Sequence, residues 1–362
     1  MAARLDQIGD RETFLKNLRK LAGLGLMGIN VDSRYGGSDA GVIAFSLAIT
    51  EIAKACASTA VTMSVNNLVC EVIQAIGSED QRICYIPKIC SGEYYAGGFG
   101  LTETMAGSDA ASLQTTAVPD GEEWVLNGSK MFITSAEYAG VFVVWAVTDR
   151  KVRKGAGIST FLVENGIPGL TVGKNEHKMG QCASATNELV FEDCRIPKTA
   201  LMGKPNGGFR VAAGELAGGR IGIGSLALGI GLAAMGYATR YAINRKQFEQ
   251  PITDFQAIQW MIAESYTELE AARLLLMNAA FKKEQGKSFA KEASMAKYYA
   301  SESAERACYN AVQILGGYGY SSKYPVERYA RDVRITSIYE GTNQIQRMIV
   351  ARDILSSLRE SS

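Results

Sequence analysis

The spacing of apolar residues divides the chain into three parts. In the first part apolar side chains recur every three or four positions, as in FLKNLRKL, and this spacing predicts helices across residues 12–94. From about residue 95 to 200, short β-branched and aromatic runs alternate with turn residues, which predicts strands. The helical spacing then returns and predicts helices at 211–245, 255–285, 288–315 and 325–357.

This order of elements predicts the fold class. Helices followed by strands and again by helices are typical of an α+β protein, whereas a parallel doubly wound sheet needs alternating strands and helices. We expect an N-terminal α-helical domain at residues 1–94, a middle antiparallel β-domain at 95–204 and a C-terminal four-helix-bundle-like α domain at 205–362.

Two short motifs have a structural interpretation in this context. Gly23, Gly25 and Gly28 match a dinucleotide-binding pattern, but they follow a helical segment rather than a strand, so we interpret them as a glycine-rich helix exit. The tripeptide Asn127-Gly128-Ser129 matches an N-glycosylation acceptor, and its strand-like flanks predict a hairpin turn instead.

Charge and hydropathy exclude several classes of partner. The 362 residues include 38 basic and 37 acidic side chains, so no one-signed field is available to hold nucleic acid. The most apolar stretch, GIGSLALGIGLAAMGYA, is rich in glycine and follows Arg220, which predicts a buried helix and no membrane insertion. The first twenty residues lack a continuous apolar segment, so we expect a soluble protein of the cytoplasm or the mitochondrial matrix.

The scarcity of histidine narrows the candidate chemistry. His177 is the single histidine, and its polar surroundings indicate a surface residue without a chemical role. The seven cysteines are scattered without CxxC or zinc spacing, which favours reduced thiols and no metal site. Carboxylates are then the preferred candidates for moving protons.

Glu340 is a carboxylate whose surroundings suit a base. Its segment, IYEGTNQIQ, combines apolar neighbours with a glycine and predicts a tight, largely apolar turn before the final helix. Burial at such a turn would raise the pKa of the acid and make it a better base for a weakly acidic carbon. From the residues alone, a carboxylate that interacts with the dipole of that helix is an equally good interpretation.

Five segments occur together in order along nearly the whole chain. They are GLTETMAGSD at 100–109, NGSKMFIT at 127–134, RKQF at 245–248, QILGGYGY at 313–320 and IYEGTNQIQ at 338–346. Together they resemble the acyl-CoA dehydrogenase family, and CASTAVTMSVNN with GRIGIGSLALGI is most similar to its short-chain (butyryl-CoA) branch. The resemblance implies an α-β-α subunit that holds FAD and an acyl-CoA thioester between the β-domain and the C-terminal helices. It also implies a homotetramer, a dimer of dimers, with electron transfer flavoprotein as the oxidant.

The resemblance also implies how the chemistry is divided. Glu340 matches the catalytic glutamate, and its amide is expected to help polarise the thioester carbonyl. Some branched- and long-chain members carry the base immediately before an arginine that matches Arg220, and here that position is Gly219, which favours Glu340. No side chain accepts a hydride, so the other half of the reaction needs a cofactor such as flavin. Ser108, Arg220 and Gly341 are expected to contact the substrate.

The residues expected to bind FAD by resemblance form two sets. The set expected along the flavin ring and the pyrophosphate is Leu101, Thr102, Ser108, Phe132 and Thr134. The set expected to reach the FAD of a neighbouring subunit is Arg245, Phe248, Gln313, Gly316 and Gly317. Thr342 and Gln344, from the segment of Glu340, are also expected to touch the cofactor.

The residues themselves leave other roles open for several of these positions. Ser108 with Asp109 also suits a helix or turn cap, and Thr134 also suits an ordinary strand position. Arg245 and Phe248 are three residues apart and are expected to share one helix face. Without the resemblance, Arg245 would be interpreted as a solvated charge on a helix.

Pocket charge bears on the substrate class. The helix that matches residues 55–70 lines the acyl terminus in the family, and it carries no Lys or Arg here, which disfavours a dicarboxylic substrate. Leu226 is expected to limit pocket depth, so short linear, small branched and alicyclic acyl groups all remain open.

Two other functions compete: a flavin-dependent acyl-CoA or nitroalkane oxidase on the same fold, and a non-catalytic flavin-binding interaction protein.

Overall fold

The first part of the chain is helical, as the spacing predicts. The computed structural model describes residues 10–360, and its N-terminal helices are α2 (Arg11–Gly23), α3 (Gly41–Ala55), α4 (Ala57–Ile76) and α5 (Glu79–Cys90). The Asp10 carboxylate accepts from the Thr13 amide at the start of α2, and Ser78 forms a capping box with Gln81 at the start of α5. Helix α2 ends at Gly23 and Gly25 has a left-handed φ of 73°, so the glycines do form a helix exit.

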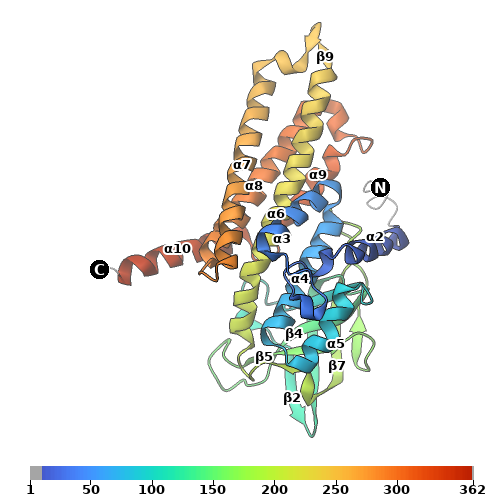
Figure 1. Ribbon diagram of the computed structural model, residues 1–362, viewed down its shortest axis with the longest axis vertical. Helices are drawn as coiled ribbons and strands as arrows, with labels where there is room; N and C mark the ends of the chain where they lie inside the picture. Colours follow the sequence, from blue (N-terminus) through green and yellow to red (C-terminus); the bar gives the residue numbers. More distant parts are fainter. Residues whose placement is uncertain (1–9, 361–362) are drawn as a thin grey trace.

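The middle part forms one mixed sheet. Its strands are β1 (Ala96–Gly100), β2 (Thr116–Asp120), β3 (Glu123–Thr134), β4 (Ala139–Val147), β5 (Ile158–Glu164), β6 (Leu170–Val172), β7 (Thr186–Pro197) and β8 (Leu201–Met202). The spatial order is β6-β7-β3-β2-β4-β5-β8, with β1 also paired to β4. Pairing is antiparallel as expected, except that β1 and β2 run parallel to β4. The sheet lies at one end of the molecule (Figure 1).

The tripeptide Asn127-Gly128-Ser129 does not form the predicted hairpin turn. It lies inside β3, where the pairing with β7 shifts its register between Leu126 and Gly128. Gly128 has a φ of 137°, and a Cβ atom there would lie 2.7 Å from the Thr115 Cα. The chain turns between β2 and β3 at Gly121 instead, so the Asn-Gly pair marks a β-bulge.

The last part is a group of long helices. Its elements are α6 (Gly208–Asn244), α7 (Gln256–Glu284), α8 (Ala290–Leu315), α9 (Val326–Val333) and α10 (Asn343–Glu360). Helices α6, α7 and α8 pack against one another, and α10 packs on α8 before it projects from the body (Figure 1).

The helix predicted at 325–357 is interrupted. Helix α9 ends at Val333, a 3-10 turn covers Arg334–Ser337, and α10 begins only at Asn343. Glu340 and Gly341 between them have φ values of 55° and 88°, which no right-handed helix contains. The apolar spacing of the sequence continues across residues 334–342, so spacing alone could not locate this break.

Helix α6 forms the centre of the helical part. Its most apolar window has a mean hydropathy of 1.7 and the length of a membrane span, but 78% of that window is buried inside the protein. Ser225 shares a buried hydrogen bond of 2.6 Å with Ser46 of α3. A Cβ atom at Gly229 would lie 2.4 Å from the Thr50 carbonyl oxygen. Close contact between helices therefore explains the glycine content of this segment.

Trp145 of β4 connects the sheet to the start of α6. Its side chain is fully buried, and Nε1 donates to the Gly208 carbonyl oxygen at 2.9 Å. Its ring lies 4.4 Å from the ring of Phe99 on β1. Burial of an aromatic ring of this size stabilises the fold by about 3 kcal/mol. The contact also fixes Phe99, which borders the cavity described below.

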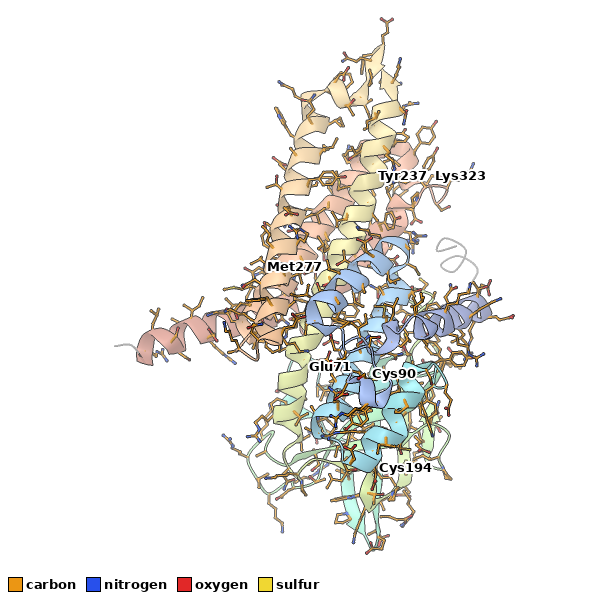
Figure 2. The ribbon with its side chains drawn as sticks, viewed as in Figure 1. Glu71, Cys90, Cys194, Tyr237, Met277 and Lys323 are labelled. Atoms are coloured by element: carbon orange, nitrogen blue, oxygen red, sulfur yellow. The ribbon has the colours of Figure 1, made fainter. Side chains whose placement is uncertain are left out.

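The cysteines are free thiols in the described part of the chain. Cys90 lies on α5 among the N-terminal helices, whereas Cys194 lies on β7 of the sheet (Figure 2). Residues 10–360 contain no group of three or more His, Cys, Asp or Glu side chains that could hold a metal ion.

Gly128→Ala is expected to lower the free energy of unfolding by about 3 kcal/mol, because the methyl group meets the Thr115 backbone in addition to an unfavourable φ. Gly121→Ala is the matched control, since its φ is also positive at 56° but nothing lies within 4 Å of its Cβ position. Only the backbone cost of about 1 kcal/mol is expected there. Denaturant unfolding of both variants measures the difference, and equal losses would contradict a rigid bulge.

Candidate active site

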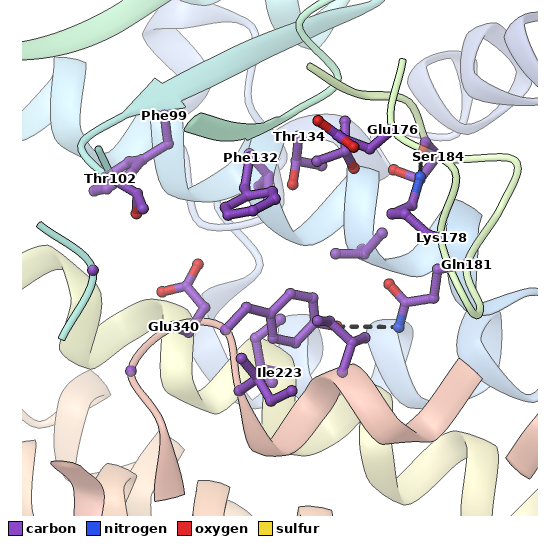
Figure 3. A pocket seen from close by; sticks show the side chains of 18 of the residues that line it. Phe99, Thr102, Phe132, Thr134, Glu176, Lys178, Gln181, Ser184, Ile223 and Glu340 are labelled. Carbon is purple, nitrogen blue, oxygen red and sulfur yellow. Dashed lines mark hydrogen bonds between the residues drawn. The ribbon is translucent and has the colours of Figure 1, made fainter. Parts of the chain in front are cut away.

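A cavity of about 520 Å³ lies where the sheet, helix α4 and the C-terminal helices meet. From the sheet side it is lined by Phe99, Leu101, Thr102, Phe132 and Thr134, and from the helical side by Val61, Val65, Arg220, Ile223, Tyr339, Glu340 and Gly341. In Figure 3 the Glu340 side chain lies across the cavity from Phe132 and Thr102. The cavity is therefore formed by segments from all three parts of the chain.

The end of strand β3 supplies the upper wall. Its register against β7 shifts a second time between Lys130 and Ile133, and Phe132 takes a φ of 58°. Ile133 then points into the core at 1% exposure, while the Phe132 ring remains 61% exposed beside the cavity. A bulge re-aims side chains at a strand end, and here it directs an aromatic ring and the Thr134 hydroxyl to one place.

A buried ion pair fastens the adjoining loop. The Lys130 ammonium is fully buried and donates to Glu103 Oε1 at 2.7 Å and to the Leu101 carbonyl oxygen at 3.4 Å. The same carboxylate accepts from the amides of Gln114 and Thr115 at 2.5 Å and 3.0 Å. Because both charges are paired and hydrogen-bonded, the pair can hold the loop after β1 in one position.

Glu340 lies in the connection between the 3-10 turn and α10. We call this connection, together with the first turn of α10, the Glu340 segment (residues 338–346). Its carboxyl group points toward the cavity, and Oε2 is buried without a hydrogen-bond partner in the described structure. Burial raises the pKa of Glu340 from 4.5 to about 7, against the opposing charges of Arg220 and Lys297. The group is therefore able to take or give a proton near neutral pH.

Gly219 of α6 lies directly beside the Glu340 carboxyl group. A Cβ atom at position 219 would be 2.7 Å from Oε2 and 3.1 Å from the carboxyl carbon. The absence of a side chain at 219 thus creates the space that the carboxyl group fills. The next residue, Arg220, is 7% exposed and donates to Ser294 Oγ at 3.3 Å, while its Nε has no partner.

Side chains hold the backbone of the Glu340 segment. Gln346 Nε2 donates to the carbonyl oxygens of Glu340 and Gly341 at 3.1 Å and 2.9 Å. Lys297 Nζ donates to the Gly341 carbonyl oxygen at 2.9 Å. The Glu340 amide donates to no backbone carbonyl among the described residues. The segment is thus fixed through its carbonyl groups, which leaves this amide available as a donor.

A loop of the β-domain contacts the same segment from the other side. Gln181 Nε2 donates to the Tyr339 hydroxyl at 3.2 Å (dashed line at Gln181 in Figure 3). It also donates to the Asp332 carbonyl oxygen at 3.1 Å. Gly180 permits this contact, because a Cβ atom there would lie 2.5 Å from the Arg331 backbone. His177 of this loop is exposed, as predicted, but it also borders the cavity.

Comparison with known families covers almost the whole chain. Residues 1–93 match the N-terminal domain, 98–194 the middle domain and 206–355 the C-terminal domain of acyl-CoA dehydrogenases. The chain belongs to the acyl-CoA dehydrogenase family. The α+β fold class predicted from the order of the elements is thereby confirmed, with the helical, β and helical domains of this family. The protein is a flavoprotein oxidoreductase of fatty acid metabolism.

Three similar proteins illustrate the relationship. The short-chain specific acyl-CoA dehydrogenase, mitochondrial, of Homo sapiens is 47% identical over 343 residues, which are 94% of this chain and 83% of the human protein. The butyryl-CoA dehydrogenase structure from Megasphaera elsdenii has a TM-score of 0.94 at 41% identity and covers 98% of this chain and 92% of that chain. A chain solved in work on the electron transferring flavoprotein of Acidaminococcus fermentans has the same TM-score of 0.94 and the same coverage, 98% and 92%, at 43% identity.

The cavity of this acyl-CoA dehydrogenase suits the FAD that the family uses. A planar ring placed on Phe132 would cover an aromatic surface that is 61% exposed in the protein alone. The Thr102 and Thr134 hydroxyls border the same space and can bind the polar edge of such a ring. The buried Oε2 of Glu340 faces this space from the opposite wall.

The structure brings most of the predicted site residues to this one cavity. Those that line it are Leu101, Thr102, Ser108, Phe132, Thr134, Arg220, Glu340 and Gly341. Thr342 immediately precedes α10 and Gln344 lies in its first turn; neither is among the residues that line the cavity, and Gln344 is exposed. Leu226 is fully buried and does not line the cavity, contrary to expectation, whereas Ile223 of the same helix does.

Arg245 and Phe248 do not share a helix face, which corrects the prediction. Helix α6 ends at Asn244, and both residues belong to a hairpin of β9 (Lys246–Gln247) and β10 (Gln250–Pro251). Phe248 has a φ of 51° and is 89% exposed. This hairpin lies at the far end of the long helices from the sheet (Figure 1).

The second predicted set is therefore grouped, but away from the cavity of its own chain. Arg245 borders a separate hollow and lies 5.7 Å from the ring centre of Tyr318. Tyr318 belongs to the 3-10 turn Gly316–Tyr320, which follows Gln313 at the end of α8. Gly316 and Gly317 are exposed, with nothing within 4 Å of either Cβ position.

Three side chains that hold the Glu340 segment are not apparent from the sequence. Gln181 carries no charge and belongs to no quoted motif, whereas Gln346 ends the quoted segment at 338–346 but has no role assigned to it there. Lys297 has one signal, because Ala293, Ala296 and Ala300 place it on an apolar face of its helix, where lysine is rare. Lys297 and its partner Gly341 are more than forty residues apart in the sequence. Helical spacing gives no information on contacts between residues so far apart.

Glu340→Gln is expected to make stability less sensitive to rising pH. The pKa of Glu340 is about 7 in the folded state and 4.5 in its usual range. The free energy of unfolding therefore falls as the pH rises from 4.5 to 7, and it falls no further above pH 7 on account of this group. The variant cannot ionise and should be more stable than the wild type by about 3 kcal/mol at pH 8, with little difference near pH 4.5. Thermal unfolding across this range measures it, and a constant difference would contradict the burial.

Proposed function

We propose that this chain catalyses the FAD-dependent α,β-dehydrogenation of a short-chain acyl-CoA to the 2-enoyl-CoA, with Glu340 as the base. The observation that carries the proposal is the buried Glu340 carboxyl group, which has no partner at Oε2 and faces Phe132 across the cavity. Identity of 47% to a short-chain specific acyl-CoA dehydrogenase supports the substrate class.

The reaction breaks two C–H bonds of the acyl chain. Glu340 takes the α-proton, and a carboxylate with a pKa of about 7 is better matched to a weakly acidic carbon than one at 4.5. Charge then develops on the thioester oxygen, where the Glu340 amide acts as a donor that Gln346 and Lys297 hold in place. FAD, when bound, supplies the acceptor for the hydride that leaves the β-carbon.

Residues of two subunits would hold the cofactor. In this proposal Leu101, Thr102, Ser108, Phe132 and Thr134 bind the flavin ring and the pyrophosphate within one chain. Arg245, Phe248, Gln313, Gly316 and Gly317 bind the FAD of a neighbouring chain, and Thr342 and Gln344 complete the contacts. The distance of the Arg245 hairpin from the cavity of its own chain supports this division (Figure 1).

The cavity walls support an uncharged acyl group. Val61 and Val65 of α4 and Ile223 of α6 contribute apolar surface, and α4 contains no Lys or Arg. A terminal carboxylate would find no cation on that helix. Ser108, Arg220 and Gly341, which border the cavity, are the residues we assign to the thioester end of the substrate.

Exposed apolar side chains support assembly into a homotetramer. The projecting helix α10 leaves Ile354, Leu355 and Leu358 between 41% and 62% exposed. On α7, Trp260 and Leu274 are 61% and 56% exposed. Surfaces of this kind are typically covered by another subunit.

Electron transfer flavoprotein is the proposed oxidant of the reduced enzyme, supported by similarity to the Acidaminococcus fermentans chain.

Anaerobic addition of butyryl-CoA to the purified holoenzyme is expected to bleach the flavin absorbance and produce a long-wavelength charge-transfer band. Such a result would establish the flavin, the thioester substrate and the dehydrogenation together. A yellow protein that bleaches only with branched or alicyclic thioesters would overturn the short linear substrate. A colourless protein that cannot be reconstituted with FAD would overturn the proposed function itself.

Glu340→Gln is expected to retain FAD and fold normally but to reduce the flavin at least about 10³-fold more slowly, because the base is lost. Stopped-flow reduction by butyryl-CoA measures the rate, and the flavin spectrum confirms cofactor binding. Asp353→Asn is the matched control, because it makes the same change on a carboxylate of α10 that pairs with Lys291 and does not line the cavity. Reduction of the Gln variant at the wild-type rate would remove Glu340 from the mechanism.

A further inference from the structure

Lys297 of α8 is a lysine with no solvent exposure. Its relative exposure is 0%, and Ala293, Ala296 and Ala300 on the same helix are equally buried. A buried ammonium group is costly unless its charge and its donors find partners. The partners of Lys297 therefore indicate what the residue does.

Every hydrogen bond recorded for its ammonium group goes to the Glu340 segment. Nζ donates to the Gly341 carbonyl oxygen at 2.9 Å and to Asn343 Oδ1 at 3.1 Å. Asn343 is fixed in turn, because its Nδ2 donates to Ser301 Oγ at 3.0 Å. Lys297 and Ser301 are one turn apart on α8. This helix thus holds the residues on either side of Thr342.

The backbone at this place needs such support. Glu340 has a φ of 55°, which costs a residue with a side chain about 1 kcal/mol, and Gly341 follows with a φ of 88°. The Gly341 carbonyl oxygen accepts from both Lys297 and Gln346. Loss of the Lys297 bonds would leave Gln346 alone to keep this carbonyl group in place.

The charges around Lys297 come from three places. Glu340 faces it from the segment, Arg220 from α6, and Glu302 and Glu305 from its own helix. Glu302 is paired with Arg347, and Glu305 with Arg334. Burial lowers the pKa of Lys297 to about 7, while Glu340 favours the charged form. Glu340 is therefore the acidic neighbour that is not already paired elsewhere.

We propose that Lys297 is a positioning residue for Glu340: its hydrogen bonds fix the backbone that carries the base, and its charge favours the ionised carboxylate. The inference rests on the proposed role of Glu340. Helix α8 would then influence the reaction through Lys297, although Lys297 is not among the residues that line the cavity.

Lys297→Met tests the proposal, because Met fills a similar volume without donors or charge. Hydrogen exchange of peptides covering residues 338–346 should become at least about tenfold faster. Flavin reduction by butyryl-CoA should slow about 10²-fold at neutral pH, because the base is misplaced. The acid limb of its pH profile should move upward by about half a pH unit or more, because Glu340 loses a neighbouring cation.

Two further variants separate this role from a structural one. Lys297→Arg keeps the charge and should return the pH profile toward that of the wild type. Lys291→Met is the matched control, because Lys291 also joins α8 to α10, through an ion pair of 3.0 Å with Asp353 that does not touch residues 338–346. It should leave both the exchange and the profile unchanged.

Several outcomes would overturn the positioning role. They are a wild-type exchange rate in Lys297→Met, an equal loss of rate at every pH, and the same effects in Lys291→Met. If Lys297→Met does not fold, Lys297→Gln replaces it, with the same shift of the profile expected. If no acyl-CoA substrate reduces the flavin of the wild-type enzyme, the proposed function is overturned. Hydrogen exchange alone would then decide the positioning role.

Discussion

The burial of the Glu340 carboxyl group against Gly219 is the constraint on which the rest of the site depends. A carboxylate in water has a pKa near 4 and is a weak base, whereas one without water or hydrogen-bond donors is hard to ionise at all. Arg220 and Lys297 lie near enough to offset part of that cost, and the pKa of about 7 reflects the balance. Helix α6 supplies the glycine and the arginine, α8 the lysine and α10 the glutamine that holds the backbone, so three helices meet around one carboxyl group.

The sheet meets this arrangement with its own fixed geometry. The bulge at the end of β3 turns Phe132 outward, and the buried pair of Lys130 and Glu103 fastens the loop that carries Leu101 and Thr102. The two halves are joined directly, since Gln181 of the β-domain donates to the hydroxyl of Tyr339, the residue before Glu340. Movement of one wall relative to the other would therefore disturb the base.

Sequence patterns predicted the helices, the strands and the position of Glu340, because periodicity and local composition are properties of short segments. They failed where long-range packing decides the conformation. The Asn-Gly pair at 127–128 has the composition of a turn, but the pairing of β3 with β7 makes it a bulge. Arg245 continues the helical pattern, yet α6 ends one residue earlier in a hairpin. The apolar face of its helix sets Lys297 apart in the sequence, but only the fold brings Gly341 to its ammonium group.

The contact between Gly219 and Glu340 also restricts how a relative with a different arrangement could arise. A protein that gains a carboxylate at position 219 while it keeps Glu340 must move the Glu340 side chain aside, since a methyl group there would already come within 2.7 Å of Oε2. A protein that first loses Glu340 has no base at all. Carboxylates from the α10 junction and from α6 therefore compete for the same space, and a glycine at 219 reserves that space for the one from the α10 junction.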